Sequence, residues 1–238
     1  VNTAIASNTG SYAGIGFAVP INLAKEVAEQ LIEHGKVRRG YLGVYIQNVT
    51  KEIAEAAGLK EPYGAMVTDV EPGTPAERAG LKPGDIIVEV NGKRVKNVQH
   101  LRGMIAHAGP GANVTLKVIR DGKEKTFKVK LAEMNKELSE GKGPSSGGGP
   151  SAEVEGWLGM KVEVSSEGAR VVEVDPKGPA AQRGIEPGDI ILKIGDVWIK
   201  GPGDYKRAQK RYSKSEKPIL LYVKKKRDGR KVFVAVRP

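Results

Sequence analysis

Residues 71–97 read EPGTPAERAGLKPGDIIVEVNGKRVKN, and residues 175–201 read DPKGPAAQRGIEPGDIILKIGDVWIKG. Ten of the 27 aligned positions are identical, and most are turn residues, helix-boundary residues or isoleucines, which fix a backbone path. A second pair of segments also matches, because residues 40–44 read GYLGV and residues 156–160 read GWLGM. The chain therefore carries the same small domain twice.

The first copy is longer than the second. The long match is offset by 104 residues and the short one by 116, so the first copy holds 12 extra residues between positions 45 and 66. Added length costs little in a surface loop. We therefore expect residues 50–63 to form a polar, partly helical insertion on the surface.

Both copies show the same order of local signals. In the first copy, a Pro after a Thr and a later Gly predict a short helix within residues 74–80. Asn91-Gly92 is typical of a tight hairpin turn, and a capping Asn predicts a helix over residues 97–108. Strands are expected between these points.

Two segments lie outside the copies. Residues 1–19 read as two strands, and residues 20–35 read as a helix that ends at a glycine. Residues 135–153 are rich in Gly, Ser and Pro and lack apolar periodicity, which predicts a flexible linker. Such a linker would let the second copy change its position relative to the first.

The charge of the chain is unevenly distributed. Residues 1–198 hold 25 Lys and Arg against 25 Asp and Glu, whereas residues 199–238 hold 14 against three. The whole net charge of +11 therefore lies in the last forty residues. Two readings remain open: an anionic partner, such as lipid head groups or nucleic acid, and a solvated lysine-rich surface.

Several kinds of site are excluded by the sequence. The chain has no cysteine, which rules out disulfides, zinc–thiolate sites and thiol nucleophiles. The sequence holds no HExxH, P-loop or GxSxG motif, and its three histidines show no telling spacing. We therefore expect no catalytic residue, metal ligand or cofactor-binding residue in this chain.

The positive signal is the segment Tyr41-Leu42-Gly43-Val44 and its counterpart. A glycine directly before a strand allows successive backbone N–H groups to turn the same way, which forms a concavity for a carboxylate. If the strand after it is a sheet edge, a peptide can add to it as a further strand. The helix over residues 97–108 would then form the second wall of the site. The alternative is that Leu42 and Val44 only start a core strand.

These motifs resemble bacterial PDZ domains over residues 40–133 and 156–238. The resemblance implies an α+β, mainly β fold: two PDZ-like domains, each a small antiparallel β-sandwich or partial barrel with two helices. It also implies that the loop binds a peptide's terminal carboxylate while the edge strand pairs with the peptide. The predicted peptide-binding residues are Arg39, Tyr41, Leu42, Gly43, Val44, Ile46, Leu101, Arg102, Ile105, Trp157, Leu158, Gly159 and Met160.

The segment before the first copy indicates which kind of PDZ-containing protein the chain resembles. Residues 14–20 read GIGFAVP and, with the helix and Arg38-Arg39 that follow, resemble the junction between protease and PDZ domains in Do-like (HtrA-type) serine proteases. The implied domains are a C-terminal remnant of a trypsin-like protease domain (1–36), a first PDZ domain (37–134), a linker (135–153) and a second PDZ domain (154–238). In that family the catalytic His, Asp and Ser all precede this junction, so we expect this chain to be inactive alone.

The resemblance also implies partners and a location. The expected ligands are the C-termini or extended segments of unfolded or regulatory proteins, and the expected location is the periplasm or bacterial cell envelope. In the intact protein we expect the chain's own protease domain and other copies of the chain as partners. A freestanding PDZ adaptor is the rival interpretation.

The second copy departs from the pattern. Trp157 and Met160 replace Tyr41 and Val44, and the expected wall helix carries lysines at 206, 210 and 214. A wall this basic favours either acidic peptides or contact with an anionic surface. We therefore expect the second copy to differ from the first in what it binds.

Overall fold

The computed structural model describes residues 2–5, 16–134 and 152–238, which divide into two units, residues 1–39 and 40–238. In the first unit, strands β1 (Asn2–Ile5) and β2 (Gly16–Ala18) pair antiparallel, and helix α1 (Ile21–His34) follows. Gly35 ends α1 in the left-handed conformation that favours glycine. Residues 6–15, which connect these two strands, lie outside the described residues.

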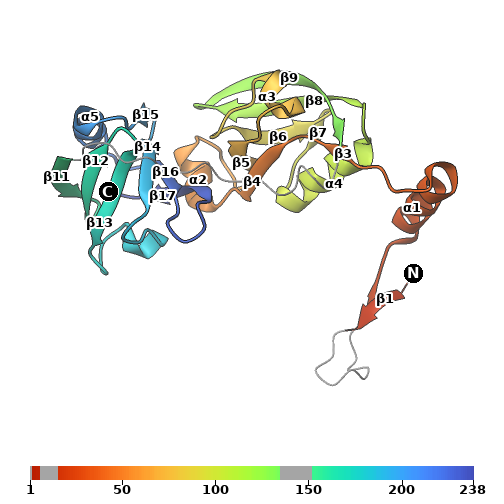
Figure 1. The fold of residues 1–238 in the computed structure, drawn as a ribbon, viewed down its shortest axis with the longest axis horizontal. Helices are drawn as coiled ribbons and strands as arrows, with labels where there is room; N and C mark the ends of the chain where they lie inside the picture. Colours follow the sequence, from red (N-terminus) through yellow and green to blue (C-terminus); the bar gives the residue numbers. More distant parts are fainter. Residues whose placement is uncertain (1, 6–15, 135–151) are drawn as a thin grey trace. The chain divides into compact units, whose positions relative to one another are not determined.

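The first copy forms an antiparallel sheet with the strand order β4-β5-β6-β8-β9, and β7 pairs with β6 (Figure 1). A separate two-stranded pair joins β3 to β10, at the entry and exit of the domain. The strands are β3 (Gly40–Tyr41), β4 (Val44–Asn48), β5 (Ala65–Val70), β6 (Ile86–Val90), β7 (Lys93–Arg94), β8 (Asn113–Arg120), β9 (Lys123–Lys130) and β10 (Ala132–Glu133).

Three helices complete the first copy: α2 (Lys51–Ala56), α3 (Pro75–Ala79) and α4 (Val98–Ala108). The side chain of Asn97 accepts a hydrogen bond from the His100 N–H at 2.9 Å and caps α4 as the sequence predicts. The apolar face of α4 and the inner face of the sheet enclose the first core, which includes Leu101, Ile105 and Leu116.

The main sheet of the second copy repeats that of the first with one further strand, β11. Its strand order is β11-β12-β13-β14-β16-β17, and β15 pairs with β14 (Figure 1). The elements are β11 (Ala152–Trp157), β12 (Met160–Ser165), β13 (Gly168–Val174), the 3-10 turn η2 (Ala181–Arg183), β14 (Ile190–Ile194), β15 (Val197–Trp198), α5 (Pro202–Tyr212), β16 (Ile219–Lys224) and β17 (Lys231–Val236).

The two copies confirm the predicted fold of small, mainly antiparallel domains, with differences in the helices. The second copy replaces α3 by the short turn η2, and the first copy adds α2. Because β11 begins at Ala152, it includes the last two residues of the predicted linker. The rest of that linker, residues 135–151, lies outside the described residues.

The insertion in the first copy is not a free surface loop, which corrects the sequence-based expectation. Ile53 and Ala54 of α2 are buried in a third apolar cluster, shared by the two copies. The first copy contributes Val49, Ile53, Ala54, Met66, Ile86, Val88 and Ile119, and the second contributes Tyr222, Phe233 and Ala235. The insertion therefore helps to build the contact between the domains.

Polar contacts surround this shared cluster. The buried hydroxyl of Tyr222 donates to the carbonyl of Thr68 at 2.8 Å. Three ion pairs also join the copies: Lys231–Asp69, Arg237–Glu55 and Arg183–Glu52, at 2.8, 2.8 and 3.0 Å. The sequence predicted a second copy free to change its position, whereas the structure packs it against the first through apolar and polar contacts. Within the described part of the chain, no helix is both long and apolar enough to cross a membrane.

Candidate peptide-binding site

The loop between β3 and β4 is held from behind by the segment that leads into α3. The Ala76 N–H donates to the Leu42 carbonyl at 2.9 Å, and the Glu71 N–H donates to the Gly43 carbonyl at 3.0 Å. The described peptide bonds are trans, so the N–H that follows each carbonyl points the opposite way. The N–H groups of Gly43 and Val44 therefore point away from this segment, as a pair of donors suited to an anion.

Gly43 allows the close approach that these bonds require. Its φ is +84°, and a Cβ built there would lie 2.2 Å from the Cβ of Thr74. The Thr74 hydroxyl in turn donates to the Glu71 carbonyl at 2.6 Å. A side chain at position 43 would force this contact apart, so glycine is required by both the backbone angle and the space.

Tyr41 contributes to the same support rather than to the open side of the loop. Its half-buried hydroxyl donates a hydrogen bond to the Glu71 carboxylate. Burial, reinforced by this carboxylate, raises the pKa of the Tyr41 hydroxyl well above its usual range. The sequence reasoning missed Glu71 and Thr74, although their position at the start of the repeated segment could have indicated them.

The strand after the loop has one edge available. β4 is the last strand of the first sheet, paired on its other side with β5, and α4 packs beside it (Figure 1). The half-buried side chains of Val44 and Ile46 pack on the first core. The side chain of Asn48 accepts from the Val98 N–H at 3.1 Å, which ties the end of β4 to the start of α4.

The predicted wall residues differ in exposure. Leu101 and Ile105 are buried in the first core, whereas Arg102 is exposed on α4. Met104 and Ala108 of the same helix, which the sequence reasoning did not name, are half-buried against the core. Arg39 belongs to the N-terminal unit and is exposed, so its role stays a prediction.

The second loop is anchored by the same two backbone bonds. The Ala180 N–H donates to the Leu158 carbonyl at 3.1 Å, and the Asp175 N–H donates to the Gly159 carbonyl at 2.8 Å. However, Trp157 and Met160 are paired across a two-residue hairpin turn, and β11 pairs with β12 along the edge that stays available in the first copy. The two predicted sites therefore share an anchored loop and differ in their strand edge.

The basic residues of the second copy are partly used within the protein. Of the 14 Lys and Arg in residues 199–238, six form ion pairs. Lys231 and Arg237 pair with carboxylates of the first copy, and Lys225 pairs with the buried Asp189 at 2.5 Å. Lys206 and Lys210 are exposed on α5. The anionic partner stays a prediction with fewer cations available to it.

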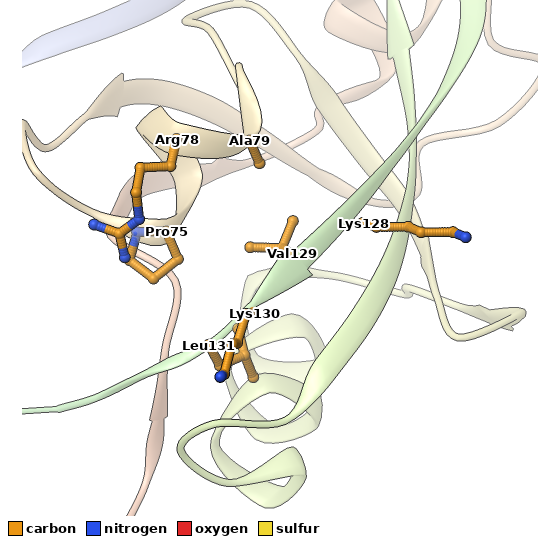
Figure 2. A pocket seen from close by; sticks show the side chains of 7 residues that line it. All are labelled: Pro75, Arg78, Ala79, Lys128, Val129, Lys130 and Leu131. Atoms are coloured by element: carbon orange, nitrogen blue, oxygen red, sulfur yellow. The ribbon is translucent and has the colours of Figure 1, made fainter.

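One hollow of about 410 Å³ lies between α3 and β9 in the first copy (Figure 2). It is lined by Pro75, Arg78, Ala79, Lys128, Val129, Lys130 and Leu131. None of the predicted peptide-binding residues lines it. Within the described residues, no His, Asp and Glu gather into a group able to hold a metal ion.

Comparison with known proteins agrees with this fold. The PDZ domain family matches residues 36–131 and 156–237, so the chain belongs to the PDZ domain family. More particularly, it corresponds to the PDZ region of an HtrA-type protease. The chain spans about half the length of the curated relatives it matches.

Two relatives illustrate the match. A probable periplasmic serine endoprotease DegP-like from Bartonella henselae is 44% identical over 99% of this chain and 47% of the relative. One of the same name from Halomonas elongata is 37% identical over 100% of this chain and 50% of the relative. Among solved structures, an HtrA-type protease AlgWS227A with a decapeptide has a TM-score of 0.52 and 38% identity, covering 57% of this chain and 41% of that one.

Proposed function

We propose that the first copy binds peptides by their C-terminal carboxylate and by strand addition to β4. The observation that carries this is the backbone geometry of the loop, in which the carbonyls of Leu42 and Gly43 are bonded from behind. Their neighbouring N–H groups face away as a donor pair beside an available strand edge. The solved AlgW structures similar to this chain carry a decapeptide or a tripeptide, which supports the proposal.

The ligands would be C-termini or extended segments of unfolded or regulatory proteins. The intact protein would be a periplasmic serine endoprotease that acts in envelope protein quality control, as the names of its relatives suggest. These names favour a region joined to a protease domain over a freestanding adaptor. Assembly of several copies of the intact protein belongs to the same proposal.

A calorimetric titration tests the first site. One apolar-ended peptide is added to the chain in two forms, with a free carboxylate and with a C-terminal amide. We expect the free acid to bind at least about tenfold more tightly, because hydrogen bonds to a charged acceptor contribute about 1.5–3 kcal/mol. Equal affinities would show that the loop does not read the carboxylate.

Two glycine variants test whether the loop at Gly43 is responsible for the preference for the free carboxylate. Gly43→Ala introduces a Cβ against Thr74, whereas Gly80→Ala has nearly the same φ, +82°, and no described atom within 4 Å of the new Cβ. Both variants carry the strain of a positive φ, but only Gly43→Ala disturbs the loop. We expect Gly43→Ala to lose the preference for the free acid and Gly80→Ala to keep it.

A further inference from the structure

The chain enters its two domains in different ways. In the first copy, the entering strand β3 pairs with the exit strand β10 and leaves the edge of β4 available. In the second copy, the entering strand β11 pairs antiparallel with β12, with Ala152 opposite Val164 and Val154 opposite Val162. It also contacts α5, the helix that matches α4. β11 therefore lies where strand addition would place a peptide.

The backbone of the second loop points at β11. The Gly159 carbonyl accepts from Asp175, on the side of β13, so the Met160 N–H points toward the opposite edge of β12. That edge is the one paired with β11. The Val44 N–H therefore faces away from the sheet in the first copy, whereas the equivalent Met160 N–H faces β11 in the second.

The turn that closes this hairpin is strained. Leu158 has a φ of +58°, an uncommon conformation for a leucine, whereas its counterpart Leu42 has a negative φ. Leu158 is nevertheless buried in the second core. Such strain persists only where the surroundings enforce it, and it is often found at switching or binding sites.

The first glycine of the GYLGV and GWLGM segments makes a different close contact in each copy. A Cβ at Gly40 would lie 2.4 Å from the Ile105 carbonyl oxygen of α4, while a Cβ at Gly156 would lie 2.7 Å from the Met160 carbonyl oxygen. Gly156 therefore lets β11 approach β12 closely. Gly156 is thus part of the contact between β11 and the edge of β12.

We propose that β11 is an intramolecular ligand of the second domain, which occupies the peptide-binding edge of β12. The inference rests on the proposed function, since it assigns to β12 the mode of recognition proposed for β4. A tethered strand competes at an effective concentration in the millimolar range for a short connection. The second domain thus takes up a peptide only when β11 is displaced, and the first domain is the one open to ligands.

The test uses the full chain, labelled for NMR, and a synthetic peptide with the sequence of residues 151–158 as the probe. Gly156→Ala places a methyl group against the backbone of β12, and Val154→Pro weakens strand pairing independently. Gly203→Ala is the matched control, because no described atom lies within 4 Å of its new Cβ. Amides of residues 160–165 report binding at β12, and amides of 44–48 report binding at β4. Amides of β16 and β17 report whether the domain is folded.

We expect the probe to bind β12 at least tenfold more tightly in Gly156→Ala and Val154→Pro than in the unaltered chain or Gly203→Ala. The proposal is overturned if the probe binds β12 equally in all four proteins, or binds it in none while β16 and β17 stay folded. An apolar-ended peptide added to the same samples reads β4 separately. A failure at β4 would therefore contradict the proposed function without being mistaken for a failure at β12.

Discussion

The side-chain amide of Gln47 forms two hydrogen bonds with the backbone of Phe233. Its Nε2 donates to the Phe233 carbonyl, and its Oε1 accepts from the Phe233 N–H, both at 2.9 Å. Gln47 lies on β4, and Phe233 lies on β17 of the other domain. The strand proposed to bind peptides is thus also a strand on which the second domain docks.

Gln47→Ala should loosen this docking. The substitution leaves the backbone groups of the buried Phe233 without these partners, which costs about 1–3 kcal/mol in the free energy of unfolding. Urea denaturation followed by circular dichroism measures the change. Gln99→Ala, at an exposed position of α4, is the control and should change the free energy by less than about 0.5 kcal/mol. Equal effects of the two variants would contradict a special role for Gln47.

Tyr205→Phe should stabilise the protein. Among the described residues, the Tyr205 hydroxyl is buried and has no hydrogen-bond partner, so its removal should gain about 1 kcal/mol. Tyr212→Phe, on the same helix, should instead lose about 0.5–1.5 kcal/mol, because that hydroxyl donates to Asp196 at 2.6 Å. Urea denaturation at neutral pH compares the two, and a loss of stability in both variants would show that the Tyr205 hydroxyl has a partner.

The buried Tyr205 also predicts that the stability of the protein depends on pH. Burial raises the pKa of Tyr205 from about 10 to about 12, so the folded state favours its neutral form. The resulting stability is present below pH 10 and is lost as the pH rises through about 12. We expect thermal unfolding temperatures to fall across this window, and to fall less in Tyr205→Phe. A profile unchanged by the substitution would assign the alkaline loss to other groups.

Asp85→Ala should be among the most damaging single changes. The buried carboxylate accepts from the Lys82 N–H and from Arg120, whose Nη2 lies 2.7 Å away. Removing one partner of a buried ion pair costs about 3–5 kcal/mol. Glu124→Ala, at an exposed position of β9, serves as the control in urea denaturation. A difference below about 1 kcal/mol between the variants would contradict the structural role of this pair.

The ion pair of Asp85 and Arg120 shows which features the sequence could predict and which it could not. The repeated PGD segment, at residues 83–85 and 187–189, is typical of a turn in both copies, because turn residues act locally. Its carboxylate is in fact paired with a cation some 35 residues later, Arg120 in one copy and Lys225 in the other. That pairing depends on which strands lie side by side, and the local pattern does not contain this information.

The two candidate binding loops were likewise predictable only in their local features. The GYLGV and GWLGM segments predicted a glycine-containing loop before a strand in each copy, and the anchoring of both loops by equivalent backbone bonds is seen only in the structure. The different partners of β3 and β11 were not predictable, since strand pairing is decided by long-range packing. The contact between the domains was missed for a related reason: the insertion was read by its length, whereas Ile53 is buried in the shared cluster.

The contact between the domains should depend on apolar packing more than on its ion pairs. The partners in the three ion pairs are all partly exposed, so each contributes about 0–1 kcal/mol. Tyr222 is buried, stacks on Phe233 with ring centroids 4.6 Å apart and donates to Thr68. Its replacement by alanine should cost about 3–5 kcal/mol.

Tyr222→Ala and Arg237→Ala test this difference, because both residues contact the first domain from the C-terminal part of the second. We expect Tyr222→Ala to separate urea unfolding into two transitions, and Arg237→Ala to leave a single transition like that of the unaltered chain. Raising the salt concentration should likewise leave the single transition intact, since surface pairs are screened while apolar contacts persist. Separation of the domains by salt or by Arg237→Ala would reverse this order of contributions and make the ion pairs the main support of the contact.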